Sequence, residues 1–143
     1  SSGERELITA YVSHLNQCHF CHTSHAAAAM AHLECDLTLI DDIKNGFQQI
    51  EISEKLRSLL RIAAKVQILG KEVKEEDIAN ARTHGATDRE IHDTVLIAAA
   101  FCMFNRYVDG LGTWAPQENA AYGEMGKRMA FTGYVRFSEP ELS

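Results

Sequence analysis

Apolar residues recur at helical spacing along most of the chain. In the run "ERELITAYVSHL" (4–15) they occupy positions 7, 8, 11, 12 and 15, which form one face of an amphipathic helix. Further along the chain, another helical pattern fills residues 53–69, with Ser53 as its N-cap and Gly70 at its end. Residues 74–83 show the pattern of a shorter helix. The first half of the chain therefore predicts helices connected by short turns.

The second half begins with a strong helix-start signal. Thr87 and Glu90 have the spacing of a capping box, which predicts a long helix over residues 88–111. Its middle, "VLIAAAFCMF", is apolar on all sides, so we expect this helix to be the central buried one. A further helix is expected near residues 117–130, followed by a tail.

Asn16 and Gln17 interrupt the pattern after the first helix, and a second helix follows in "HFCHTSHAAAAMAHL". Its four consecutive alanines would let another helix approach closely. The run "CDLTLIDDIKNGF" fits either a short helix or an irregular crossing that turns at residues 45–46. No alternating strand pattern is convincing, and proline occurs only twice. We therefore predict an all-α bundle of about six helices.

Length and composition narrow the class of protein. A chain of 143 residues predicts one domain over residues 1–143. The net charge of −6, with basic residues interleaved among acidic ones, argues against a nucleic-acid partner. No apolar run is long enough for a membrane span, and we expect no signal peptide. Four cysteines do not make a disulfide scaffold, so we expect a reducing, cytoplasmic setting.

The candidate chemistry lies in "CHFCHTSH" (18–25). On a helix Cys18, Cys21 and His25 share one face. A helix N-terminus or a neighbouring histidine lowers the pKa of a thiol, so one sulfur could attack a peroxide or a disulfide and the other could close a disulfide. His25 could take the thiol proton. Glu6 is the leading candidate to orient His25, because a hairpin at the interruption would bring the two together.

Three other interpretations use the same motif. "CHFCH" has the c-type haem attachment pattern, with Cys18 and Cys21 as thioether sites and His22 as axial ligand. A zinc site could use Cys18, Cys21 and His25, with Glu6 or His22 as the fourth ligand. The cysteine pair could also serve a dithiol–disulfide oxidoreductase or a redox sensor. We favour sulfur chemistry, which needs no bound cofactor or metal.

The run "GERELITAYVSHLNQCHFCHTSHAAAA" resembles the AhpD-like family, the alkylhydroperoxidase-like branch of the carboxymuconolactone decarboxylase superfamily. The family pattern is Glu, eleven residues, Cys, two residues, Cys, three residues, His, and Glu6, Cys18, Cys21 and His25 match it. The runs "ATDREIHDTVLIAAAFCMFNRYVDGLG" and "AAYGEMGKRMAFTGY" look like later segments of the peroxidase-related members. The likeness covers most of the chain.

The resemblance implies a thiol-dependent peroxidase. Cys21 would be the peroxidatic thiol, Cys18 its resolving partner in a Cys18–Cys21 disulfide, and His25 with Glu6 the proton relay. A hydroperoxide would be the substrate and a dithiol or thioredoxin-like protein the reductant. Family members are all-helical and usually form homo-trimers or homo-hexamers.

The chain departs from the family in two places. The best-studied branch has a histidine immediately before its second cysteine, where this chain has Phe20; a histidine stands at His19 instead. Peroxidase-related members usually carry further helix before the region where this chain starts. The decarboxylase branch lacks the paired cysteines, so lactone decarboxylation is not expected.

One polar cluster interrupts the apolar long helix. Asn105, Arg106 and Asp109 follow directly after its apolar middle. Buried polar groups must be paired, so this trio predicts an internal or intersubunit hydrogen-bond network. Lining of the substrate pocket is the alternative.

Overall fold

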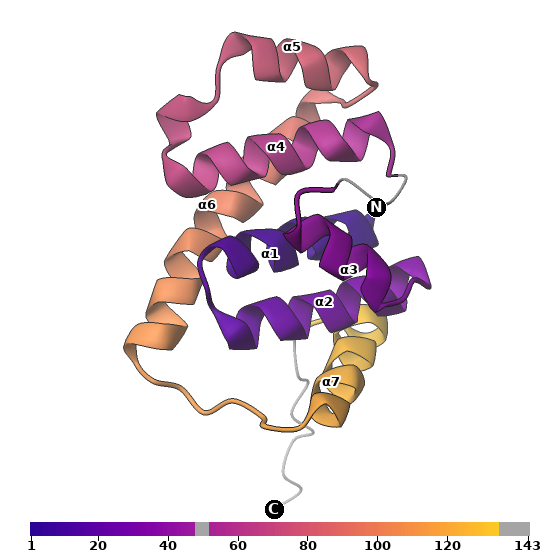
Figure 1. The fold of residues 1–143 in the computed structure, drawn as a ribbon, viewed down its shortest axis with the longest axis vertical. Helices are drawn as coiled ribbons and strands as arrows, with labels where there is room; N and C mark the ends of the chain where they lie inside the picture. The colour runs from indigo at the N-terminus through magenta and orange to yellow at the C-terminus, as the bar shows by residue number, and fades with distance from the viewer. Residues whose placement is uncertain (48–51, 135–143) are drawn as a thin grey trace, which may run out of the picture.

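The computed structural model describes residues 1–47 and 52–134 of the chain (Figure 1). These residues form α-helices and one short 3₁₀ helix, with no strand among them, so the predicted all-α class is confirmed. The α-helices number seven in the described residues, because the ambiguous run after Cys35 is a helix. In chain order the elements are α1 (Ser2–Leu15), α2 (His19–Leu33), α3 (Leu37–Lys44), α4 (Glu54–Ile68), η1 (Gly70–Glu72), α5 (Glu75–Thr83), α6 (Asp88–Gly110) and α7 (Asn119–Thr132).

The helices begin where the sequence provides caps. The Ser53 hydroxyl accepts a hydrogen bond from the backbone N–H of Leu56, at 3.1 Å, and starts α4. Thr87 accepts from the backbone N–H of Glu90 at 3.2 Å, and the Glu90 carboxylate accepts in return from the Thr87 N–H at 2.8 Å. The predicted capping box is therefore present at the start of α6.

The helices α1 and α2 form a hairpin at the centre of the molecule (Figure 1). Helix α7 packs along α2, and α6 packs against α1 and α4, running from the end of the molecule that holds α5 to the opposite end. The main core lies between α1, α2, α4 and α6 and includes Leu7, Val12, Leu60, Ile62 and Ala98. In the described part of the chain, no helix is long and apolar enough to cross a membrane.

Helix α7 packs so closely on the alanine-rich stretch of α2 that the backbones of the two helices are in contact. A Cβ atom added to Gly126 would lie 2.5 Å from both the carbonyl carbon and the Cβ of Ala27. Such a distance is far below van der Waals contact, so glycine is required at this crossing. The predicted close approach of a helix to the alanines is thus confirmed.

Helix α6 is not the central buried helix that its composition predicts. Helices α1 and α4 cover only one side of it, and α5 touches it at its start. On the opposite side its apolar residues are exposed, with Leu96, Met103 and Tyr107 at 57%, 59% and 65% of their full accessibility. In this single chain the expectation of full burial is therefore wrong.

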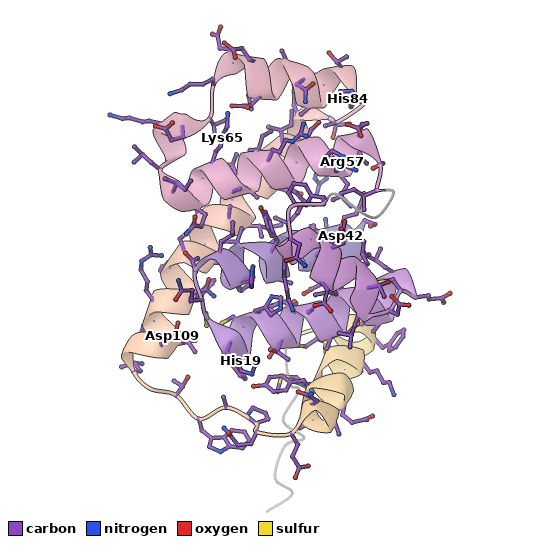
Figure 2. The ribbon with its side chains drawn as sticks, in the orientation of Figure 1. His19, Asp42, Arg57, Lys65, His84 and Asp109 are labelled. Atoms are coloured by element: carbon purple, nitrogen blue, oxygen red, sulfur yellow. The ribbon has the colours of Figure 1, made fainter. Side chains whose placement is uncertain are left out.

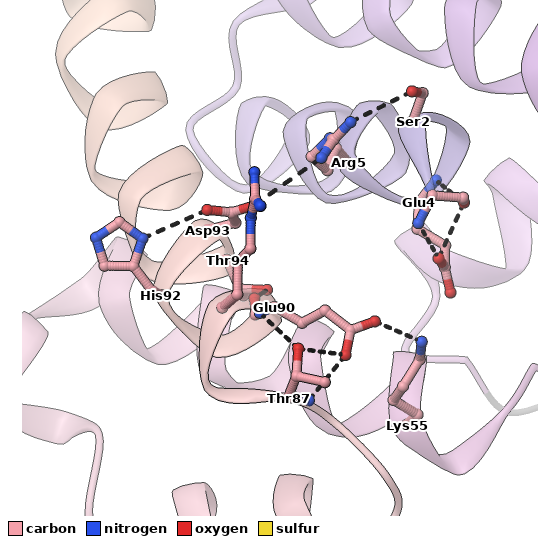
Figure 3. A network of polar contacts seen from close by, with 11 residues as sticks. Ser2, Glu4, Arg5, Lys55, Thr87, Glu90, His92, Asp93 and Thr94 are labelled. Carbon is pink, nitrogen blue, oxygen red and sulfur yellow. Dashed lines mark hydrogen bonds and ion pairs between the residues drawn. The ribbon is translucent and has the colours of Figure 1, made fainter.

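A polar network fixes the start of α6 against α1 and α4 (Figure 3). Lys55 of α4 donates to the Glu90 carboxylate at 2.7 Å, and Arg5 of α1 pairs with Asp93 at 3.9 Å. The Lys55 contact and the capping bonds from Thr87 lower the pKa of Glu90 to about 2. The ionised form of Glu90 is therefore favoured in the folded protein.

We expect Glu90→Gln to lower the free energy of unfolding by about 1 kcal/mol at pH 7, because it removes a partly exposed ion pair but leaves a capping acceptor. The folded pKa lies below the unfolded one, so the contribution is complete above pH 4.5 and disappears as the pH falls toward 2. Urea unfolding across this pH range measures the difference. Glu124→Gln, at the exposed Lys127 pair, is the control; a pH-independent difference would contradict the assignment.

Candidate active site

A tight turn between α1 and α2 presents the two cysteines. Gln17 has a left-handed backbone conformation, with φ of 61°, and the Cys18 N–H donates back to the Ser13 carbonyl at 3.0 Å. Cys18 is the N-cap residue of α2 and Cys21 lies in its first turn, so the motif is at a helix N-terminus as predicted. Both cysteines are buried, at 1% and 5% exposure, and both are free thiols.

A buried hydrogen-bond network holds this turn against α6. Asn105 donates to the Ser13 hydroxyl at 3.1 Å and accepts from the Asn16 side chain at 2.9 Å. Asn16 accepts in turn from Gln67 of α4 at 2.9 Å. The predicted internal network is confirmed for Asn105, whereas Arg106 is exposed and donates to the Cys102 carbonyl of its own helix.

The α1–α2 hairpin brings Glu6 and His25 together. Nδ1 of His25 lies 2.7 Å from a Glu6 carboxylate oxygen, and both side chains are nearly buried. The Phe101 ring packs edge-on against the imidazole, with ring centroids 4.7 Å apart. An ionised Glu6 selects the imidazole tautomer with hydrogen on Nδ1, which leaves Nε2 as the free base. The contact predicted from the hairpin is therefore present.

Tyr134, just beyond α7, completes this cluster. Its hydroxyl donates to the second Glu6 oxygen and lies 3.4 Å from Nδ1 of His25. Burial alone would raise the pKa of Glu6, but the hydrogen bonds from His25 and Tyr134 outweigh it and lower that pKa. Burial and the Glu6 contact raise the pKa of Tyr134, which keeps its hydroxyl a donor. Sequence reasoning missed Tyr134; the only signal was its place in the C-terminal segment that resembles the family.

The cysteines and the His25–Glu6 pair are separate units in the structure. Within residues 1–47 and 52–134, no hydrogen bond joins His25 to Cys18 or Cys21. The Cys18 thiol instead donates to a carboxylate oxygen of Asp109, at 3.2 Å. Burial, followed by contacts with Cys21 and Asp109, raises the pKa of Cys18 to about 12. Cys18 is thus held as a protonated thiol.

A cavity of about 280 Å³ opens beside Cys18. Gln17 and three histidines, His14, His19 and His22, complete its lining. Nδ1 of His22 lies 2.9 Å from the Ala10 carbonyl, which ties the ring to α1. A neighbouring cavity of about 310 Å³ extends between α2, α3 and α7 and has a mainly apolar lining. Of the two cysteines, Cys18 is the one that lines this open space.

The metal-site hypothesis lacks a ligand set in the described residues. No group of three or more His, Cys, Asp or Glu side chains among them is arranged to hold a metal ion. The histidine that zinc would use, His25, is hydrogen-bonded to Glu6.

Two solved structures of other proteins have a fold similar to that of this chain. The chain superimposes on a protein from Ralstonia eutropha JMP134, described as an alkylhydroperoxidase AhpD core and an uncharacterized peroxidase-related protein, with a TM-score of 0.77 and 30% identity. An uncharacterized peroxidase-related protein from Silicibacter sp. TM1040 gives a TM-score of 0.74 and 30% identity. These matches cover 89% and 86% of this chain, which spans 65% and 62% of the two longer proteins. Comparisons with protein-family models and with curated proteins gave no match.

The fold and the site define a helical protein with a paired-cysteine motif at the start of a buried helix. In fold and sequence the chain is similar to the alkylhydroperoxidase AhpD core, and both solved relatives are described as peroxidase-related. The roles of Cys18, Cys21, His25 and Glu6 in this chain stay predictions.

The Asn105 network generates a stability prediction. We expect Asn105→Ala to lower the free energy of unfolding by about 2 kcal/mol, because Ser13 and Asn16 lose their buried partner. Urea unfolding measures the change, and Arg106→Ala, on the exposed neighbour, is the control and should differ from wild type by less than about 0.5 kcal/mol. Equal effects of the two substitutions would contradict the importance of the network.

Proposed function

We propose that this chain is a single AhpD-like domain, residues 1–143, that reduces hydroperoxides through Cys18 and Cys21. The observation that carries the proposal is the buried His25–Glu6 contact, one helical turn beyond a cysteine pair at a helix N-terminus. A neutral His25, oriented by an ionised carboxylate, is a suitable proton acceptor for a thiol. The peroxidase-related solved relatives support the same class of activity.

The proposed reaction starts at Cys21. His25 takes the Cys21 proton through Nε2, across a bridging water or the bound peroxide, because the two side chains lie one turn apart on α2. The thiolate attacks the terminal peroxide oxygen, and the O–O bond breaks. His25 returns its proton to the leaving alkoxide, which departs as an alcohol. Cys21 is left as a sulfenic acid.

The two sulfurs then form a disulfide. Cys18 attacks the Cys21 sulfenic acid, and water leaves. A dithiol or thioredoxin-like reductant takes the disulfide back to two thiols and closes the cycle. The position of the pair supports this assignment, because Cys18 at the N-cap and Cys21 in the first turn are adjacent along one face of α2.

Peroxide consumption with a dithiol donor tests the proposal. Cys21→Ser should abolish turnover, and Cys18→Ser should stop it after one sulfenic acid per chain. His25→Ala should slow it by about 10² to 10⁴-fold, and Glu6→Gln by less, since Glu6 acts through His25. Cys35→Ser, outside the pair, is the matched control and should leave the rate unchanged. An unchanged rate in Cys21→Ser would show that the mechanism is wrong.

The same purified protein distinguishes the other candidates. A dithiol–disulfide oxidoreductase or sensor would exchange disulfides at a Cys21-dependent rate while consuming no peroxide. A Soret band that survives denaturation would establish covalent haem, and stoichiometric zinc would establish a metal site. Any of these results in place of peroxide turnover would overturn the proposal.

We further propose that the chain assembles with copies of itself, as a trimer or a hexamer. The exposed side of α6 supports this: a stripe at helical spacing, which we call the α6 stripe, is apolar and uncovered in the single chain. Its members are Leu96, Met103, Phe104, Tyr107 and Leu111. A helix that is apolar on all sides is normally buried, and a second copy would provide the missing cover.

We expect Met103→Glu and Tyr107→Glu to shift the assembly to the monomer, because each places a charge in the contact. Light scattering after size-exclusion chromatography measures the mass. Ile68→Glu makes the same change at an apolar residue outside the stripe that is more exposed, at 75%, and should leave the mass unchanged. A monomeric wild-type chain at micromolar concentration would contradict self-association.

A further inference from the structure

We propose that Asp109 is the catalytic base for Cys18: it accepts the Cys18 proton as the Cys18–Cys21 disulfide forms and gives it to the leaving hydroxide. The inference rests on the proposed redox role of the cysteine pair. It assigns the disulfide-forming step its own proton acceptor, separate from the His25–Glu6 pair.

The contact between Asp109 and Cys18 carries this inference. A carboxylate oxygen of Asp109 accepts from the Cys18 sulfur at 3.2 Å, across 91 residues of sequence. Cys18 is 1% exposed, so the thiol has little access to water as an alternative acceptor. Figure 2 shows Asp109 near the C-terminal end of α6, at the same end of the molecule as His19 at the start of α2.

The position of Asp109 is determined by the way α6 packs against the turn between α1 and α2. Asn105 lies one turn earlier on α6 and is hydrogen-bonded to Ser13 in α1 and to Asn16, the first residue of the turn that ends at Cys18. Residues four apart share a face of a helix, so the same face of α6 that holds the turn also presents Asp109 to the thiol. The Cys18–Asp109 contact is therefore part of a fixed docking of α6 onto the turn.

The other titratable groups around Cys18 do not replace Asp109 as acceptor. Cys21 is the partner in the reaction, and Tyr122 of α7 is 2% exposed with an unpartnered hydroxyl among the described residues. Burial, followed by the nearby Cys18, raises the pKa of Tyr122, which favours its neutral, donating form. His14, His19 and His22 line the adjoining cavity, and none is hydrogen-bonded to Cys18 in the described residues. Asp109 is the carboxylate in contact with the sulfur.

The proposed step balances without an added reagent. The Cys18 sulfur attacks the Cys21 sulfenic sulfur, the S–S bond forms and the S–O bond breaks. The Cys18 proton moves to the Asp109 carboxylate as the S–S bond forms, and the departing hydroxide takes it from Asp109 to become water. Asp109 ends ionised, as it began. The cysteine pair has lost two electrons in total, and the peroxide accepted both when Cys21 became a sulfenic acid.

The same contact explains how the two sulfurs keep different roles. A carboxylate that accepts from the Cys18 thiol favours its protonated form, so Cys18 does not compete with Cys21 for the peroxide. Once Cys21 is a sulfenic acid, the same oxygen is already placed to take the proton. Asp109 thus keeps the Cys18 thiol unreactive until Cys21 has become a sulfenic acid that it can attack.

The variant Asp109→Asn distinguishes a role of Asp109 as proton acceptor from a purely structural role. The amide oxygen still accepts a hydrogen bond from Cys18 but is not a base. We expect disulfide closure after one equivalent of hydrogen peroxide to slow by about 10²-fold, and a trapped Cys21 sulfenic acid to accumulate on reaction with dimedone. Asp109→Glu keeps a carboxylate and should recover most of the rate, and Asp93→Asn, elsewhere on α6, should match wild type. Closure in Asp109→Asn at the wild-type rate would overturn the inference.

A second readout moves in the opposite direction. In a Cys21→Ser background, Asp109→Asn removes a negative charge beside Cys18, so alkylation of Cys18 by iodoacetamide at pH 8 should become several-fold faster. A faster alkylation together with a slower closure is not expected from a loosened turn, which would expose the thiol and speed both. An unchanged or slower alkylation would count against the contact in solution.

A test without peroxide keeps this inference separate from the proposed function. In a Cys35→Ser/Cys102→Ser background, the aromatic disulfide DTNB converts Cys21 to a mixed disulfide with thionitrobenzoate. Cys18 then attacks the Cys21 sulfur, the S–S bond to thionitrobenzoate breaks, and the coloured thiolate is released while Asp109 takes the proton. We expect this second release to be slowed in Asp109→Asn even if the protein reduces no hydroperoxide. If peroxide turnover fails and the second release is slowed, the proposed function is wrong and the role of Asp109 stands.

Discussion

The packing of α1 against α2 as a buried hairpin is the constraint on which the site depends. It places Glu6, near the beginning of one helix, against His25, which lies 19 residues later on the other. The same packing needs a reversal of the chain in three residues, and that reversal ends at Cys18. The contact between His25 and Glu6 and the placement of the two cysteines therefore both result from one hairpin. A shift of either helix along the other would move both at once.

Burial gives the polar contacts of this site their strength. Glu6 and His25 are almost completely removed from water, and so are both sulfurs. In such surroundings an unpaired charge is costly, so the neighbours of Glu6 and Cys18 influence which form of each group is favoured. Tyr134 and His25 hold Glu6 ionised, whereas Asp109 and burial hold Cys18 protonated. The site thus contains a carboxylate held in its ionised form and a thiol held in its protonated form.

Much of this arrangement could be predicted from the sequence, because it follows from local spacing. The positions of α1 and α2, the capping box at Thr87 and the contact between Glu6 and His25 all depend on residues close in sequence or on one hairpin. Contacts between residues far apart in the sequence could not be predicted in this way. The polar trio in α6 predicted a network, but nothing in the spacing indicated that Asp109 would meet Cys18 or that Tyr134 would reach Glu6. The expected burial of α6 failed because composition does not show how many neighbours a helix has in one chain.

The glycine at the crossing of α7 and α2 has a consequence at a distance. Gly126 lets the two backbones touch at Ala27, and Tyr134 follows eight residues later on the same C-terminal segment. A side chain at position 126 would act as a spacer and swing the end of α7 away from α2. The hydroxyl of Tyr134 would then leave Glu6, although no atom of the site had been altered. The backbone contact at Gly126 therefore supports the hydrogen bond that Tyr134 donates to Glu6, 128 residues earlier in the sequence.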